Sequence, residues 1–332
     1  MKRLAALVLS TCVTTAATVD AKGPAFTSPE EAGIDFTIQG EYSGDLGFGD
    51  DAEKYGVQLI ALGEGKFQVV GYHGGLPGDG WNGENPVRVE GKFAILDDGT
   101  VKLQDHHGVG VVQDGTMTCD LGEDGEIDGT LNRIVRVSPT LGMEPPDGAM
   151  VLYGGRDDVA NWKGGQSDEE GDLMQGVTSH ETFGSHQLHV EFRLPFMPES
   201  RGQARGNSGC YLQGRYEVQM LDSFGLEGEM NECGGIYTVT GVDTNMCFPP
   251  LSWQTYDIDY TAAKYDDDGE LVANPRITVR HNGVLIHNDL ELPGDRNTRG
   301  APLQAGPEPG PVYLQNHGNP VRYRNIWVVK RD

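Results

Sequence analysis

Apolar and polar residues alternate in short segments along most of the chain, and turn residues separate these segments. Residues 56–62 and 66–72 flank Gly63-Glu64-Gly65, and residues 276–281 and 284–287 flank Asn282-Gly283, so both pairs predict β-hairpins. After the N-terminus, no stretch keeps the i, i+3, i+4, i+7 spacing of an amphipathic helix for more than a few turns. Many short strands with few helices predict an all-β protein made of sandwiches or barrels.

The strand segments fall into two blocks, joined by a Pro- and Gly-containing stretch at 141–148. We therefore predict a smaller β-rich domain over residues 22–145 and a β-sandwich over residues 146–332.

The N-terminus has the order of a secretory signal peptide. Lys2 and Arg3 precede an apolar run at 4–9, and small residues follow up to Ala21. We expect residues 1–21 to be removed and the protein to be exported to the periplasm or the extracellular space. No later run approaches the ~20 apolar residues needed to cross a bilayer, so no membrane span is expected.

The charge of the chain restricts its partners. Asp and Glu number 50 against 25 Lys and Arg, which gives a formal net charge of −25. Such a field repels polyanions, so nucleic acid is an unfavourable partner and a neutral or cationic one is expected.

Four cysteines remain if Cys12 is removed with the signal peptide: Cys119, Cys210, Cys233 and Cys247. Three pairings are possible in an oxidising compartment. We favour a disulfide between Cys233 and Cys247, because it would close a glycine-containing loop.

A row of polar residues runs through segment 207–222. Read as one strand, the segment places alternate residues on one face, namely Tyr211, Gln213, Arg215, Glu217 and Gln219, and apolar residues on the other. Amides, a cation, a carboxylate and an aromatic ring suit the recognition of sugar hydroxyls and rings. The alternative is a solvated outer face.

Two further rows carry titratable groups. Tyr313, Gln315 and His317 share a face near the C-terminus, so His317 is expected at the rim of the same cleft. On another strand His189 alternates with Glu191 and Arg193, and the last two residues could equally form a surface ion pair.

Several stretches of the second block resemble the 3-keto-disaccharide hydrolase family, also described as 3-keto-glucoside lyase and hydratase. The similarity extends in order over about residues 150–330 and lies in residues 189–195, 207–223, 233–237, 253–257, 281–283 and 313–327. It implies a concanavalin-like, laminin-G-like β-sandwich that acts on 3-keto-glycosides. The first block is only loosely similar to a β-domain of some secreted members.

The resemblance implies elimination chemistry that suits the polar rows. A ketone at C3 acidifies the C2 proton, a base removes it, the C1 substituent leaves, and water adds back. Glu217 and His317 are the acid and base candidates, without an assignment of which is which. The expected substrate-binding residues are Asn207, Tyr211, Gln213, Arg215, Gln219, Asp222, Gln315, Asn319 and Arg322.

This chemistry requires no cofactor. A divalent metal could polarise the ketone, with His317, Glu217, His189 or Glu191 as ligands, although no spacing demands one.

Two other functions fit the same residues. A retaining glycosidase would use Glu217 and Asp222, but positions five apart point to opposite faces of a regular strand unless a bulge intervenes. A carbohydrate-binding or adhesion module without chemistry is also compatible with the predicted fold.

Overall fold

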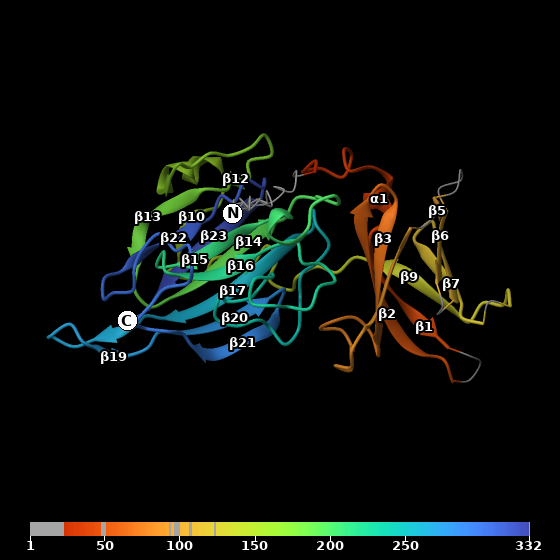
Figure 1. Ribbon diagram of the computed structural model, residues 1–332. Coiled ribbons are helices and arrows are strands. Elements are labelled where there is room, and N and C mark those ends of the chain that lie inside the picture. The colour runs from red at the N-terminus through yellow and green to blue at the C-terminus, as the bar shows by residue number, and fades with distance from the viewer. Residues whose placement is uncertain are drawn as a thin grey trace, which may run out of the picture.

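The computed structural model describes residues 23–47, 51–92, 94–95, 100–105, 108–122 and 124–331. The predicted signal peptide lies outside the described residues. Two β-rich parts lie side by side (Figure 1), one formed by strands β1 to β9 and the other by strands β10 to β23. The prediction of an all-β chain with a C-terminal sandwich preceded by a smaller β-rich domain is confirmed.

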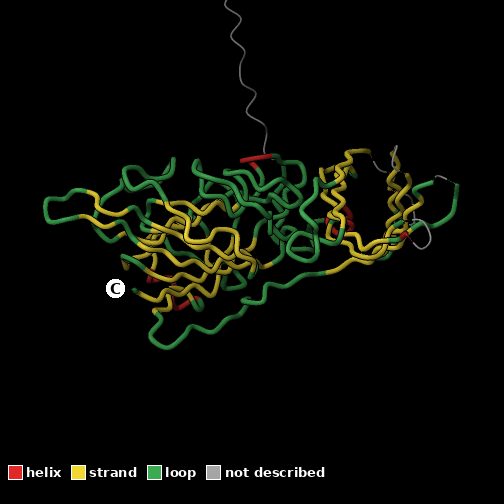
Figure 2. Tube along the Cα trace, turned by 90° about the horizontal axis from the view of Figure 1, so that it is seen from below, coloured by secondary structure: helices red, strands yellow, loops and turns green. Residues whose placement is uncertain are grey.

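The N-terminal part is one antiparallel sheet of nine strands in the order β4-β3-β2-β1-β9-β8-β7-β6-β5. The strands at the two ends of this order, β4 and β5, are separated by one residue in the sequence. The chain therefore curls the sheet into a barrel, which Figure 2 views close to its axis. The elements are α1 (Gly33–Ile38), β1 (Gly40–Leu46), β2 (Glu53–Gly63), β3 (Lys66–His73), β4 (Val87–Lys92), β5 (Ala94–Ile95), β6 (Val101–Asp105), β7 (Gly108–Gln113), β8 (Thr116–Asp120) and β9 (Gly129–Ile134).

Turn chemistry explains the tight reversals of this meander. Glu64 and Gly65 have φ of 55° and 68°, and Asp114 and Gly115 have φ of 48° and 77°. These left-handed conformations cost least for Gly and little for Asp. The hairpin predicted around Gly63-Glu64-Gly65 is confirmed by the pairing of Gly63 with Lys66.

The C-terminal part contains two facing antiparallel sheets. One has the order β10-β23-β14-β17-β20-β21, with β12 also paired to β23, and the other has the order β11-β13-β22-β15-β16. The elements are β10 (Met150–Tyr153), the 3-10 helix η2 (Arg156–Asn161), β11 (Trp162–Lys163), β12 (Leu173–Met174), β13 (Val177–Phe183), β14 (His186–Arg193), the 3-10 helix η3 (Gly202–Ala204), β15 (Ser208–Leu212), β16 (Tyr216–Met220), β17 (Trp253–Thr261), β18 (Lys264–Tyr265), β19 (Leu271–Ala273), β20 (Arg276–His281), β21 (Val284–Glu291), β22 (Gly310–Leu314) and β23 (Arg322–Lys330).

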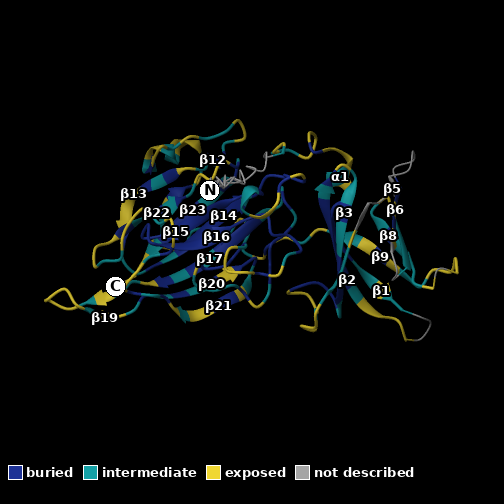
Figure 3. Cartoon of the chain, viewed as in Figure 1, coloured by how far each residue is buried: buried dark blue, intermediate teal, exposed yellow. Residues whose placement is uncertain are grey.

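Alternate residues of each sheet form the sandwich core. Leu188, Val190 and Phe192 of β14 face Leu212 and Val218 of the β15–β16 hairpin within one buried apolar cluster. Figure 3 shows this burial in dark blue along β14, β16 and β17. The odd-numbered residues of β15 and β16 consequently point away from the core, on the outer face of the five-stranded sheet.

Segment 207–222 is a hairpin, so the prediction of a single strand was wrong. Gln213 and Gly214 have φ of 52° and 62° and reverse the chain, and Tyr211 pairs with Glu217 while Leu212 pairs with Tyr216. Because three residues form the turn, the alternation of faces continues across it. Tyr211, Glu217 and Gln219 therefore keep a common face, whereas Gln213 and Arg215 lie in the turn.

The barrel packs against the sandwich through apolar contacts and buried polar ones. Ile60, Val70 and Tyr72 on the outside of the barrel form a cluster with Phe224, which follows β16. Arg205 donates to the carbonyl of Ala61 at 3.0 Å. The outer face of β2 is thus buried by the second part of the chain.

The four described cysteines are free, and Cys210, Cys233 and Cys247 are fully buried. The structure thus does not contain the predicted disulfide, and Cys233 and Cys247 contact each other as thiols within the sandwich core. Within the described ranges, no helix has the length and apolar character needed to cross a membrane.

Candidate functional site

A polar cavity of about 270 Å³ lies on the outer face of the five-stranded sheet. Strand β16, the residues after β22, and three loops surround it. The lining residues are Gln203, Asn207, Glu217, Gln219, Tyr237, Arg299, Gly300, Gln315 and His317. The structure therefore brings together five residues predicted from the sequence, namely Asn207, Glu217, Gln219, Gln315 and His317.

Glu217 occupies the floor of the cavity and is 2% exposed. Glu217 pairs with Tyr211 on β15, and Gly209 lies two residues before Tyr211 on the same strand. A Cβ added at Gly209 would lie 2.0 Å from Glu217 Oε1. The backbone N–H of Glu217 donates to Thr298 Oγ1 at 3.1 Å. Because residue 209 is glycine and has no side chain, the carboxyl group of Glu217 has room to lie beside it.

Burial raises the pKa of Glu217 to about 8, although the hydrogen bond from Tyr211 lowers it. Tyr211 Oη donates to Glu217 Oε2 at 2.7 Å and accepts from Gln315 Nε2 at 3.0 Å. At neutral pH the carboxyl group is mostly protonated, because desolvation disfavours its charged form. Tyr211 does not line the cavity itself but connects two residues that do.

Three amide side chains line one side of the cavity. With its nitrogen turned toward the acceptors, Gln219 donates to Glu217 Oε1 at 2.9 Å and to the carbonyl of Ser208 at 3.0 Å. Asn207 Nδ2 donates to the carbonyl and to Oε1 of Gln203, at 2.8 and 3.0 Å. Asn207 is 1% exposed and its Oδ1 has no hydrogen-bond partner among the described residues. A buried acceptor of this kind can receive a hydrogen bond from a ligand hydroxyl.

His317 lies at the exposed rim, as the sequence predicted. Asn319 lies beneath this segment, fully buried, and its Oδ1 accepts from the backbone N–H of Asn207 at 2.7 Å. Asn319 thus holds Asn207 in place but does not line the cavity. We predicted that Asn319 would contact the substrate, but in the structure it positions Asn207.

Arg215 and Gln213 hold a loop that reaches the cavity. Arg215 donates to the carbonyls of Gln304 and Glu308, at 2.6 and 2.8 Å, and to Gln213 Oε1 at 3.2 Å. Loop 295–309, which contains these carbonyls, contributes Arg299 and Gly300 to the lining. Arg215 therefore acts through this loop. Gln213, which also accepts from Tyr260 Oη and donates to the carbonyl of Phe183, reaches the loop only by way of Arg215, and neither residue is on the polar face on which we expected it.

Two other predicted residues form ion pairs away from the cavity. Asp222 Oδ2 lies 2.6 Å from Arg205 Nε at the boundary with the barrel. Arg322 Nε lies 2.7 Å from Asp168 Oδ2, near the point where β12 pairs with β23. Both carboxylate–guanidinium pairs are structural, so neither Asp222 nor Arg322 closes the cleft.

The four residues considered as metal ligands lie on different sheets. His189 and Glu191 belong to β14, on the outer face of the other sheet, where His189 Nδ1 lies 2.6 Å from Asp257 and Glu191 lies 2.7 Å from Arg324. Over the described part of the chain, no three His, Cys, Asp or Glu side chains are grouped so as to hold a metal ion.

Sequence reasoning missed Gln203, Tyr237, Arg299 and Gly300. Tyr237 belongs to one of the stretches that resemble the family, but from the sequence we assigned it no role at the site. Gln203 and Arg299 lie in η3 and in a loop, where no alternation of residues marks a face. Only the folding of these loops over the sheet places them beside Glu217.

Comparisons with known proteins identify the family of the chain. A family model described as a 3-keto-alpha-glucoside-1,2-lyase-like domain matches residues 141–329, more than half of the chain, and confirms the resemblance inferred from the sequence. A solved structure from Parabacteroides distasonis, provisionally described as a glycosyl hydrolase, is 32% identical over 56% of this chain and 85% of that chain, with a TM-score of 0.49. Two further structures from that organism with the same description are 17% and 18% identical, cover 56% and 55% of this chain and 95% and 99% of theirs, and have TM-scores of 0.41 and 0.39. No curated protein matches the chain.

Proposed function

Because the chain belongs to the family of 3-keto-alpha-glucoside-1,2-lyase-like domains, it is a carbohydrate-active enzyme, and we propose that it cleaves the glycosidic bond of 3-keto-glycosides. The supporting observation is the pairing in one cavity of a buried carboxyl group, Glu217, with an imidazole at the rim, His317. Among the described residues that line the cavity, Glu217 is the single carboxylate. Ordinary glycosidases need two carboxyl groups, whereas elimination next to a ketone needs one acid and one base.

The raised pKa of Glu217 separates the two roles. A carboxyl group whose pKa is about 8 carries its proton at neutral pH and acts as the acid. His317 then acts as the base that takes the C2 proton. The electron pair of the C2–H bond forms the C1–C2 double bond by way of the C3 enolate. The C1–O bond breaks, and the leaving oxygen receives the proton of Glu217.

The remaining polar groups suit the sugar and the enolate. The guanidinium of Arg299 offers positive charge to a developing oxyanion, and the unpartnered Asn207 Oδ1 offers an acceptor to a sugar hydroxyl. Water added across the C1–C2 double bond completes net hydrolysis and yields the free 3-keto-sugar.

The test compares an oxidised sugar with its unoxidised parent. Purified protein is incubated with 3-keto-trehalose, trehalose or a β-glucan, and released glucose and 3-keto-glucal are followed. Turnover of the 3-keto-sugar alone supports the proposal. Turnover of the glucan would instead favour an ordinary glycosidase, and binding without turnover of any of them would favour a binding module.

Single replacements test the two roles. Glu217→Gln and His317→Ala are each expected to lower kcat by roughly 100- to 10,000-fold. Glu181→Gln and His180→Ala, at exposed positions of β13 in the same sheet, are the matched controls and should keep full activity. Full activity in both Glu217→Gln and His317→Ala would contradict the assignment.

The pH dependence separates acid from base at Glu217. If Glu217 is the acid, kcat/KM falls as pH rises through about 8, because the proton needed by the leaving group is lost. A rise of kcat/KM through the same pH range would reverse the assignment.

We also propose that the protein is exported, on the basis of the signal-like order of residues 1–21. Mass spectrometry of the mature protein from culture fractions tests this proposal, and a cytoplasmic protein that retains Met1 would contradict it.

A further inference from the structure

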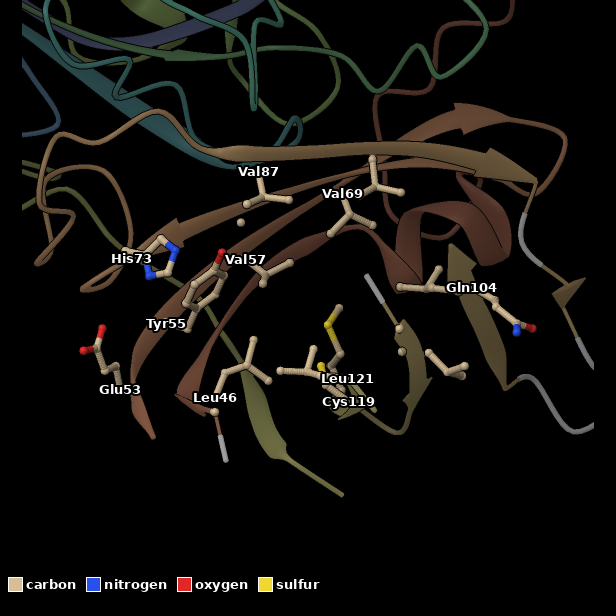
Figure 4. A pocket seen from close by; sticks show the side chains of 18 of the residues that line it. Leu46, Glu53, Tyr55, Val57, Val69, His73, Val87, Gln104, Cys119 and Leu121 are labelled. Atoms are coloured by element: carbon tan, nitrogen blue, oxygen red, sulfur yellow. The ribbon is translucent and has the colours of Figure 1, made fainter. Parts of the chain in front are cut away.

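The barrel of strands β1 to β9 encloses a second cavity, of about 550 Å³. Its lining is predominantly apolar and includes Val57, Val69, Val87, Leu103 and Met117, which come from five strands. Figure 4 shows Val57, Val69 and Val87 among the side chains that line it. Apolar cavities of this size are unusual in a fold stabilised by close packing, because each unfilled volume forfeits contacts. Neither the proposed reaction nor the cleft beside Glu217 uses this cavity.

The barrel is filled at one end and open at the other. Leu59, Phe67, Val101 and Leu131 form a fully buried core toward the end where α1 lies. Toward the other end the inward positions include Gly71 and Gly110, which contribute no side chain. A Cβ at Gly71 would lie 2.7 Å from Tyr55 Cε1, whereas one at Gly110 would make ordinary contacts at 3.4 and 3.5 Å with Leu103. The cavity thus has room for a side chain at position 110, and glycine leaves that room empty.

Carboxylates surround the open end. The ends of β1 and β8 meet there, because the N–H of Gly47 donates to the carbonyl of Asp128 at 3.0 Å and the N–H of Asp128 donates to the carbonyl of Cys119 at 2.9 Å. Asp51 and Glu53 line the cavity mouth, Asp120 is the last residue of β8, and Asp124 lies in the turn that follows. Lys54, on the same strand as Glu53, lies 3.9 Å from Asp79. An anionic head group at this mouth would be repelled, in a chain that already has a net charge of −25.

Polar groups able to meet a neutral head lie just inside the mouth. The rings of Tyr55 and His73 pack edge to face with their centroids 4.8 Å apart, and both line the cavity (Figure 4). A tyrosine hydroxyl and an imidazole can each donate or accept a hydrogen bond. The cavity thus combines an apolar body with a small polar end.

We propose that the barrel binds a small amphiphile, with its apolar chain among the valines and leucines and a polar head without negative charge at the acidic mouth. Eight-stranded barrels already have room for one small ligand, and this barrel has nine strands. Ligand cavities commonly measure about 300 to 1,000 Å³. Water is a poor occupant, since an apolar lining offers it few hydrogen-bond partners. The site is independent of the proposed catalytic function, because its lining residues all belong to β1 to β9 and their turns.

Competition against a neutral apolar dye, Nile red, tests the proposal on the full-length protein. Decan-1-ol, decyltrimethylammonium and decanoate each have a ten-carbon chain, if the carboxylate carbon of decanoate is counted, and they differ in head group. The alcohol and the ammonium are expected to displace the dye at concentrations about tenfold lower than decanoate at low salt. Absence of dye binding would overturn the site, and equal displacement by decanoate would overturn the role of the acidic mouth.

Variants that fill the cavity with a larger side chain provide a second test. Gly110→Phe should abolish dye binding while circular dichroism and turnover of the 3-keto-sugar stay unchanged. Val111→Phe lies on the same strand but outside the cavity lining and is the matched control, expected to bind as the wild type does. If Gly110→Phe fails to fold, Val89→Phe fills the cavity from β4. Wild-type binding by a folded, filled variant would overturn the proposal.

Discussion

The carboxyl group of Glu217 illustrates how a single side chain combines a cost in stability with a chemical role. Burial raises its pKa to about 8 from an ordinary value of 4.5. Between these two pH values the folded protein binds a proton that the unfolded chain has released. Stability is therefore lost as pH rises through this window.

Replacement of Glu217 by Gln should remove this pH dependence. Below pH 4.5 the wild type and Glu217→Gln should differ little, and above it the variant should gain relative stability of up to roughly 1.4 kcal/mol for each pH unit until about pH 8. Urea unfolding at a series of pH values measures this difference. A constant difference across the range would show that the carboxyl group does not titrate as inferred.

Gly209 is predicted to be essential for activity though it has no side chain. Gly209→Ala would place a Cβ 2.0 Å from Glu217 Oε1 and so displace the acid from its position. Displacements of about 1 Å can cost roughly 100-fold in rate, so kcat should fall by about that factor. Gly184→Ala, where an added Cβ meets no atom within 4 Å, is the control for the substitution itself. Wild-type kcat in Gly209→Ala would contradict the inferred geometry.

The β15–β16 hairpin and loop 295–309 form the cavity together, although they are about eighty residues apart in the chain. Arg215 in the hairpin turn donates to two carbonyls of that loop, and its own carbonyl accepts from Thr298 Oγ1 at 3.0 Å. The planar fork of arginine makes these simultaneous contacts, which the single ammonium of lysine cannot reproduce.

Arg215→Lys should consequently loosen the loop that presents Arg299. We expect KM to rise by roughly tenfold with a smaller change in kcat, and loop 295–309 to be cleaved faster by a protease. Arg296→Lys, at an exposed position of the same loop, is the matched control. If kcat alone fell while KM and cleavage stayed at wild-type values, Arg215 would instead act directly on the reaction.

The barrel and the sandwich are joined by a buried ion pair as well as by apolar packing. Arg205 lies 2.6 Å from Asp222 and also donates to Ala61 of the barrel, and both charged side chains are nearly inaccessible. Removal of one partner leaves a buried charge without compensation.

Arg205→Ala is expected to lower the free energy of unfolding by ~3–5 kcal/mol, because Asp222 would remain buried and unpaired. Chemical unfolding followed by tryptophan fluorescence measures the loss. Arg276→Ala removes an exposed arginine with two carboxylate partners and should leave stability nearly unchanged. Equal stability of Arg205→Ala and the wild type would show that the pair does not stabilise the contact between the two parts.

The sequence by itself determined the all-β architecture, the family and the meeting of Glu217 with His317. Alternation along a strand is a local property, so it places Tyr211, Glu217 and Gln219 on one face even though the segment proved to be a hairpin. Because the turn contains three residues, odd-numbered residues lie on the same face of the sheet before and after it. The family motifs all lie within the sandwich and follow one another in the sequence, so their order could be recognised without coordinates.

Only the tertiary structure decided which polar residues reach the cavity. Asp222 and Arg322 were expected to contact substrate, but each is neutralised by a partner, Arg205 and Asp168, the latter 154 residues away in the sequence. Arg299 and Gln203 were missed, because irregular loops bring them to the site. Ion pairs and loop packing join residues that no sequence period relates, and only the folded chain shows which of them are neighbours.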